Sequence, residues 1–109
     1  MAEITYSLSY LPLFYNDLEE HVLYIADVLG SPDAANDLLD KVEQAILQRL
    51  PNAESFEQYH SKKERKNPYY RIYVKNYVIY YVVIPVSETN RTMEVRRILH
   101  TLQDRNNII

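Results

Sequence analysis

The chain has no cysteine, no tryptophan and a single glycine among its 109 residues. Without thiols it can form neither a disulfide framework nor a thiolate metal site. Its three histidines, His21, His60 and His100, are too scattered along the sequence to suggest the spacing of metal ligands. We therefore expect a protein that uses no metal and no cofactor.

Long hydrophobic runs are also missing. The longest apolar stretch, YVIYYVVIPV at residues 77–86, is far shorter than the roughly 20 residues that a transmembrane helix needs. The first residues, MAEITYSL, lack the basic and apolar regions of a secretory signal. We expect a cytoplasmic protein without a membrane partner. With 47% hydrophobic and 25% charged residues, the chain should form one domain over residues 1–109.

The net charge of −3 conceals a strong asymmetry along the chain. Residues 1–59 carry 2 Lys or Arg and 11 Asp or Glu, whereas residues 60–109 carry 10 and 4. The second half, with a net charge of +6, could meet a polyanion such as RNA, or an acidic partner peptide. Two solvated faces that merely attract each other would explain the same pattern.

The acidic half has the apolar periodicity of two helices. Apolar residues at three- and four-residue steps predict a helix from Leu11 to Leu29, which Gly30 would end in a left-handed conformation. Ser31 offers an N-cap oxygen and Pro32 suits the first turn of a second helix, which should run to Pro51. The short connection predicts an antiparallel helical hairpin.

The remaining segments are rich in β-branched and aromatic residues and predict four strands, namely EITYSL, YYRIYV, YVIYYVVI and TMEVRRIL. Lys75 and Asn76 should form a tight turn between the second and third strands, with Asn76 at positive φ. The order β-α-α-β-β-β predicts an α+β fold, with the helical hairpin packed on one face of a mainly antiparallel four-stranded sheet. We expect the other face to be partly open and to carry the function.

Strand alternation predicts which side chains reach that open face. At residues 69–74 the less apolar set points away from the helices, namely Tyr69, Arg71 and Tyr73. In the last strand, strict alternation puts Arg96 and His100 on the open face and Arg97 on the other. Arg97 would join them only through a β-bulge or at the rim of the sheet.

Two segments resemble a known family. RILHTLQD, from Arg97 to Asp104, resembles the R-[IV]-L-H-x-x-x-D ending of RelE/ParE superfamily toxins, and RIYVKNYVIYYVV resembles the arginine-led hairpin that precedes it there. Element order, length and the acidic helical hairpin are similar over nearly the whole chain. Thr101 replaces the usual glycine, and Leu102 stands where many members carry a basic residue. The resemblance implies the toxin of a type II toxin-antitoxin module, with a cognate antitoxin covering the open sheet face.

The superfamily attacks two unrelated targets, because RelE-like toxins cleave mRNA on the ribosome and ParE-like toxins poison DNA gyrase. We predict first a metal-independent, ribosome-dependent mRNA interferase, which needs an acid, a base and a cation at one phosphate. His100 would exchange protons near neutral pH, and Arg71 with Arg97 would hold the phosphate. Glu94 and Arg96 are auxiliary candidates. A ParE-like gyrase poison without nuclease chemistry, or an inactive binding module, remains the alternative.

Each candidate also has an ordinary structural interpretation. His100 could cap a strand end, Arg71 could pair with a carboxylate, and Asp104 could order the C-terminal turn. The loop HSKKERK could be solvated, or it could contact RNA phosphates. On the second interpretation the RNA-binding candidates are Lys62, Lys63, Arg65, Lys66 and, through base stacking, Tyr73. The overall acidity of the chain argues against RNA, whereas its basic second half argues for it.

Overall fold

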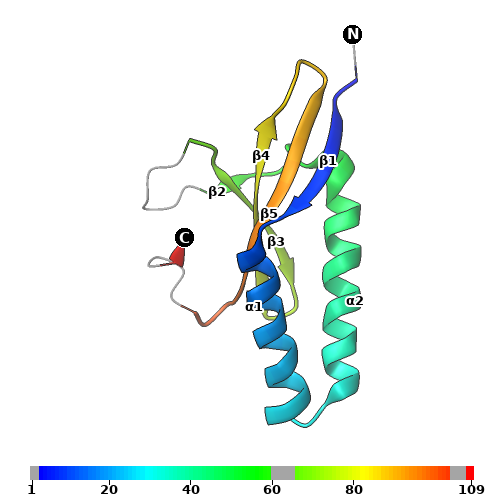
Figure 1. The fold of residues 1–109 in the computed structure, drawn as a ribbon, viewed down its shortest axis with the longest axis vertical. Helices are drawn as coiled ribbons and strands as arrows, with labels where there is room; N and C mark the ends of the chain where they lie inside the picture. Colours follow the sequence, from blue (N-terminus) through cyan, green and yellow to red (C-terminus); the bar gives the residue numbers. More distant parts are fainter. Residues whose placement is uncertain (1–2, 60–65, 104–107) are drawn as a thin grey trace.

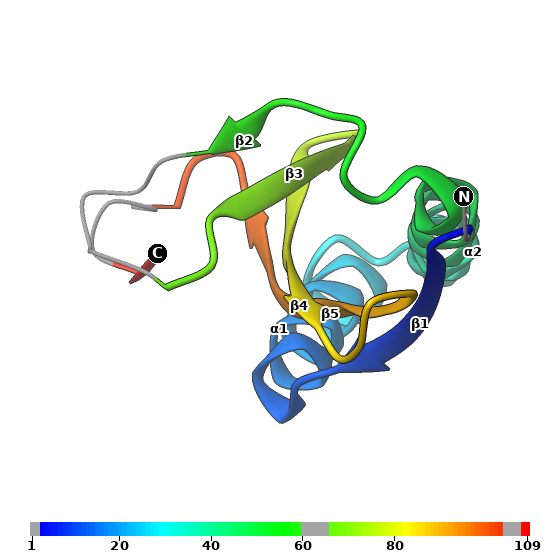
Figure 2. The same cartoon turned by 90° about the horizontal axis from the view of Figure 1, so that it is seen from above.

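Two helices pack against one side of a five-stranded mixed sheet in the computed structural model, which describes residues 3–59, 66–103 and 108–109 (Figures 1 and 2). The helical segments are α1 (Pro12–Leu23), the π-helix η1 (Tyr24–Val28), α2 (Pro32–Arg49) and the short 3-10 helix η2 (Leu50–Asn52). The strands are β1 (Thr5–Tyr10), β2 (Gln58–Tyr59), β3 (Tyr69–Val74), β4 (Tyr77–Pro85) and β5 (Asn90–His100).

The sheet has the strand order β1-β5-β4-β3-β2. β1 lies parallel to β5, from Thr5 opposite Asn90 to Tyr10 opposite Val95, and the other pairs are antiparallel. The predicted α+β class is confirmed, and three of the four strand pairs are antiparallel. The prediction of four strands is wrong, because β2 adds a fifth strand, and β1 joins the sheet in parallel. A parallel pair needs a long crossover, which the chain between β1 and β5 supplies. Residue alternation carries no information about pairing direction.

The connection of the helical hairpin forms at the residues that predict it, whereas α2 ends at Arg49, two residues before the predicted end at Pro51, and continues as η2. Gly30 has φ +67°, and the Ser31 amide donates to the Ile25 carbonyl at 3.0 Å, which closes the end of the first helical segment. The Ser31 hydroxyl accepts from the Ala34 amide at 3.3 Å as the N-cap of α2. However, α1 ends at Leu23 and continues as the π-helix η1. Over a single turn, the spacing of apolar residues in the sequence does not distinguish a π-helix from an α-helix.

The main core lies between the helices and the sheet. The helices contribute Phe14, Leu38, Val42 and Ile46, and the sheet contributes Tyr70, Ile72, Ile79, Tyr81, Met93, Val95 and Ile98. Alternation in β3 therefore gives the correct helix-facing residues. We call this side of the sheet the helix face and the opposite side the far face.

The far face is partly covered. A second buried cluster covers its centre and includes the end of the chain; its members are Tyr69, Val78, Tyr80, Val82, Leu99 and Ile109. Every residue of β4 from Tyr77 to Val83 is buried, which is typical of a strand covered on both faces. The centre of the far face is covered because β4 is apolar on both sides, whereas Tyr73 on β3 stays 61% exposed, so the face is only partly open.

Two irregularities shape the strands. The β3–β4 hairpin forms as predicted, but Lys75 rather than Asn76 has a positive φ, of 53°. In β5 the pairing shifts, since Tyr80 lies opposite Arg97 and Tyr81 lies opposite Val95. Arg96 is thus the extra residue of a β-bulge. This bulge decides where the charged side chains of β5 lie.

Candidate functional site

The β-bulge reverses the alternation expected in β5. Before it, Met93 and Val95 belong to the core on the helix face, and after it Ile98 takes that role while Leu99 joins the far-face cluster. Arg97 therefore lies opposite Tyr80, a far-face residue. The β-bulge that the sequence analysis required for Arg97 to reach this face is present. The same shift puts His100 opposite Tyr77, which belongs to the helix-face core. The prediction that Arg96 and His100 share a face is wrong for this reason.

Arg71 and Arg97 belong to one row of the sheet. Tyr80 in β4 lies opposite both of them, Arg71 in β3 and Arg97 in β5. Neighbouring strands are about 4.8 Å apart, so the two arginines start roughly 10 Å apart on the far face. The row thus brings together two of the three predicted catalytic residues at the level of the backbone.

The Arg97 guanidinium, however, turns to Asp17 in α1. Its Nε and Nη2 donate to the two carboxylate oxygens of Asp17 at 2.7 and 2.8 Å, a bidentate ion pair. The hydrogen bonds to Asp17 raise the pKa of Arg97 above its ordinary value. Only 11% of the Asp17 side chain and 23% of the Arg97 side chain are exposed. Two of the five N–H donors of Arg97 are therefore engaged with Asp17 inside the molecule.

Asp17 and His21 complete the edge of β5 where β1 no longer pairs with it. The register of β1 ends at Val95, and beyond that point α1 packs against β5. The Asp17 carboxylate accepts from the Ile98 amide at 3.1 Å, and the His21 Nε2 lies 2.8 Å from the Ile98 carbonyl. Sequence reasoning missed both residues. The available signal was a carboxylate within the apolar stripe of α1, four residues before a histidine.

The other far-face cations contact tyrosine rings. The Arg71 guanidinium lies 4.7 Å from the ring centre of Tyr59 and 5.7 Å from that of Tyr73, and it has no carboxylate partner within the described residues. Arg96 bonds to Glu94 at 2.8 Å. Burial lowers the pKa of Arg96, but hydrogen bonds to Tyr69 and Glu94 raise it by more. The pKa of Arg96 is therefore above its ordinary value. The two auxiliary candidates thus bind each other, whereas Arg71 has no ion-pair partner among the described residues.

His100 is held by its own loop, on the opposite face of the sheet from Arg71 and Arg97. Its Nδ1 accepts from the Leu102 amide at 3.1 Å, and its own amide donates to the Gln103 side chain at 2.6 Å. A neutral imidazole that accepts at Nδ1 carries its proton on Nε2. The ring meets Tyr77 edge to face, with centres 5.2 Å apart. The loop after His100 is therefore ordered by the histidine itself, with Thr101 in place of the usual glycine.

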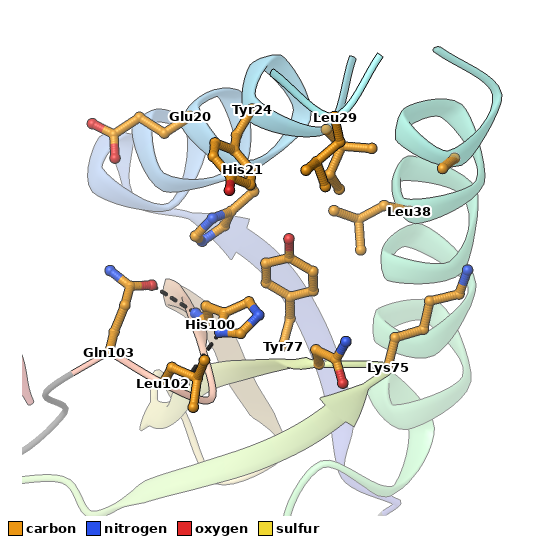
Figure 3. Close-up of a pocket in the computed structure, with 13 residues that line it drawn as sticks. Glu20, His21, Tyr24, Leu29, Leu38, Lys75, Tyr77, His100, Leu102 and Gln103 are labelled. Atoms are coloured by element: carbon orange, nitrogen blue, oxygen red, sulfur yellow. Dashed lines mark hydrogen bonds between the residues drawn. The ribbon is translucent and has the colours of Figure 1, made fainter. Parts of the chain in front are cut away.

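His100 lines a cavity of about 750 Å³ between the end of the helical hairpin and the β3–β4 turn (Figure 3). His21 lies in the same cavity, with its ring 4.7 Å from that of Tyr77. Much of the remaining lining is apolar, including Tyr24, Ile25, Leu29 and Leu38. Within the described residues no three His, Asp or Glu side chains gather as a metal site. The cavity is suited to an apolar group with polar atoms at its rim.

Three of the predicted RNA-binding residues lie outside the described residues, namely Lys62, Lys63 and Arg65. Asp104, the candidate for ordering the C-terminal turn, also lies outside them. Lys66 is exposed, and 61% of Tyr73 is exposed beside Arg71. None of the helices in the described part is both long and apolar enough to cross a bilayer.

Comparison with known proteins identifies a family. The family model described as "ParE toxin of type II toxin-antitoxin system, parDE" matches residues 8–105. Among curated proteins, none matches the chain. The matched region runs from β1 past the end of β5 and so includes both helices, the bulged strand and the His100 loop. The chain belongs to the ParE toxin family of type II toxin-antitoxin systems.

Proposed function

We propose that this toxin inhibits growth by poisoning DNA gyrase and that it acts by binding, without nuclease chemistry of its own. The toxin role and the existence of an antitoxin partner follow from the family. The choice of gyrase extends what the ParE-like resemblance implies. The observation that carries it is the bidentate engagement of Arg97 by Asp17.

Metal-independent RNA cleavage requires an acid, a base and free hydrogen-bond donors around one phosphate. Here Arg97 directs two donors at Asp17. His100 lies opposite Tyr77 of the helix face, whereas Arg71 lies opposite Tyr80 of the far face. The groups that would have to converge thus start on different sides of the sheet, which favours a toxin that acts through its surface.

The far face is the surface that we propose for the antitoxin. Arg71 offers a guanidinium without a carboxylate partner in the described part, next to the exposed ring of Tyr73. An acidic, amphipathic antitoxin segment would supply the missing counter-charge and cover the aromatic rings. Arg71→Glu should therefore weaken antitoxin binding, whereas Lys41→Glu on exposed α2 should leave it unchanged.

One observation favours the second candidate, ribosome-dependent mRNA cleavage. Arg71 and Arg97 flank Tyr80 in one row on the far face, so the two cations could meet an RNA backbone there. This mechanism requires Arg97 to leave Asp17 and the His100 imidazole to reach the same phosphate. We rank it second because it needs both rearrangements.

The deciding experiment induces the chain in bacteria and follows mRNA integrity and gyrase-linked DNA breaks in parallel. The proposal predicts DNA breaks with intact ribosome-bound mRNA, and it predicts that purified toxin inhibits supercoiling by gyrase. His100→Ala should remain toxic, because no proton transfer is required. Cuts in ribosome-bound mRNA that disappear in His100→Ala would instead select the nuclease. A chain that produces neither effect would be an inactive binding module.

A further inference from the structure

The end of the helical hairpin exposes large apolar side chains. We call residues 23–29 the hairpin tip; they include the π-helix η1. Of its side chains, Leu23 is 50% exposed, Tyr24 53%, Val28 68% and Leu29 61%. Contiguous exposed apolar residues of this kind mark interaction sites in soluble proteins. π-Helices are rare and are frequently found at functional sites.

The hairpin tip stands over the cavity that His100 lines. Tyr24 and Leu29 belong both to the exposed tip and to the cavity wall (Figure 3). Leu102, which is 89% exposed, lines the opposite side of the opening. The cavity volume of about 750 Å³ lies in the range of binding pockets, roughly 300–1,000 Å³. An apolar surface that continues into an apolar pocket can hold a large anchoring side chain.

The surroundings of the tip are acidic. Residues 19–37 contain five carboxylates and no lysine or arginine. Asp37 bonds to Lys41 and Lys75, and within the described residues the other four have no ion pair; they are Glu19, Glu20, Asp27 and Asp33. Glu20 lies on the cavity lining itself, and the charge of Lys75, which also lines the cavity, is paired with Asp37. The local charge is therefore opposite to that of Arg71 on the far face.

We infer that the hairpin tip and its cavity form the docking surface for a basic amphipathic segment of the toxin's target protein. One large apolar side chain of that segment enters the cavity between Tyr24 and Leu29, and its lysines or arginines face Glu20 and Asp27. This inference rests on the proposed function, in which toxicity arises from binding a protein target. The acidic rim repels the acidic antitoxin segment expected at Arg71, so the two partners use different surfaces.

The test compares a tip variant, Val28→Ser with Leu29→Ser, with a control variant, Leu13→Ser with Leu47→Ser. The control side chains are 51% and 50% exposed but lie outside the tip. For each protein we would measure growth inhibition, inhibition of purified gyrase, thermal unfolding and binding of the antitoxin encoded beside it. The tip variant should lose about tenfold or more in toxic potency, as expected for anchor residues. Its antitoxin binding should match that of the control.

Two outcomes would overturn the inference. One is a folded tip variant that is as toxic as the control; the other is a tip variant that loses antitoxin binding, which would make the tip an antitoxin site. Asp27→Lys adds a test of charge and should weaken toxicity more at low salt than at high salt. If the wild-type chain stops growth but does not inhibit gyrase, only the choice of gyrase as the target is refuted. The comparison of the tip and control variants in the growth assay then still tests docking to another target.

Discussion

Replacing Asp17 should reveal how strongly α1 holds the bulged end of β5. The Asp17 carboxylate accepts three hydrogen bonds, two from the Arg97 guanidinium and one from the Ile98 amide, and the residue is 8% exposed. Asp17→Ala removes all three acceptors at once. It leaves a largely buried guanidinium and a buried backbone N–H group without their partner.

The structure allows the cost to be worked out. An unsatisfied buried donor costs about 1–3 kcal/mol, and breaking a buried ion pair costs about 3–5 kcal/mol. The Arg97 side chain keeps 23% of its exposure, so water can solvate part of the freed charge. We therefore expect Asp17→Ala to lower the free energy of unfolding by about 3 kcal/mol and the melting temperature by about 12 °C. Asp17→Asn keeps an oxygen for the Ile98 amide and should cost about half as much.

Urea unfolding followed by circular dichroism measures these values, with Asp33→Ala as the control because Asp33 is exposed on α2. A double-mutant cycle with Arg97→Met isolates the ion pair. The double variant should be at least about 1 kcal/mol more stable than the sum of the single changes predicts. Additivity within about 0.5 kcal/mol, or an Asp17→Ala protein as stable as the control, would refute the reasoning.

Three further changes test other parts of the fold. Gly30→Ala meets no atom within 4 Å, so only the strain of its φ of +67° should appear, about 1 kcal/mol by urea unfolding. Ser31→Ala removes the N-cap of α2 and should cost about 0.5–1 kcal/mol, whereas Ser31→Asp should restore it. Burial raises the pKa of the Tyr81 phenol, against a smaller opposite effect of Arg49. Burial also raises the pKa values of Tyr6, Tyr10 and Tyr77. The phenols of the unfolded chain lose their protons at a lower pH than those of the folded protein, so the free energy of unfolding should fall as the pH rises above about 10. A urea midpoint that does not change between about pH 9 and about pH 11 would contradict this.

The helical hairpin could be read from the sequence because its signals are local. Gly30 needs the left-handed conformation, and the Ser31 hydroxyl reaches an amide only three residues away, so both act within one turn of the chain. Alternation in β3 worked for a similar reason, since a regular strand needs no partner to set its faces. These elements would take the same form with different neighbours.

The arrangement of β5 could not be read in this way. Its bulge at Arg96 is defined by pairing with β4. Its last residues are completed by Asp17 and His21, which lie 81 and 77 residues from Ile98 in the chain. The far-face cluster likewise joins Ile109 to residues of β3, β4 and β5. Each of these features is set by long-range contacts. The resemblance in the RILHTLQD segment identified the family correctly, but it could not say on which face His100 lies.

The ion pair between Asp17 and Arg97 also separates the two candidate mechanisms. A nuclease that uses Arg97 to hold phosphate must first break the pair, and a coupling of about 1.4 kcal/mol already keeps the free form tenfold rarer. Asp17→Asn weakens the pair while keeping an acceptor for the Ile98 amide, so it should speed RNA cleavage if Arg97 is catalytic. A gyrase poison gains nothing from freeing Arg97, and its potency should stay equal to or below that of the wild type. Measuring supercoiling inhibition and ribosome-dependent cleavage for this one variant therefore tests both mechanisms, since faster cleavage would refute the gyrase proposal.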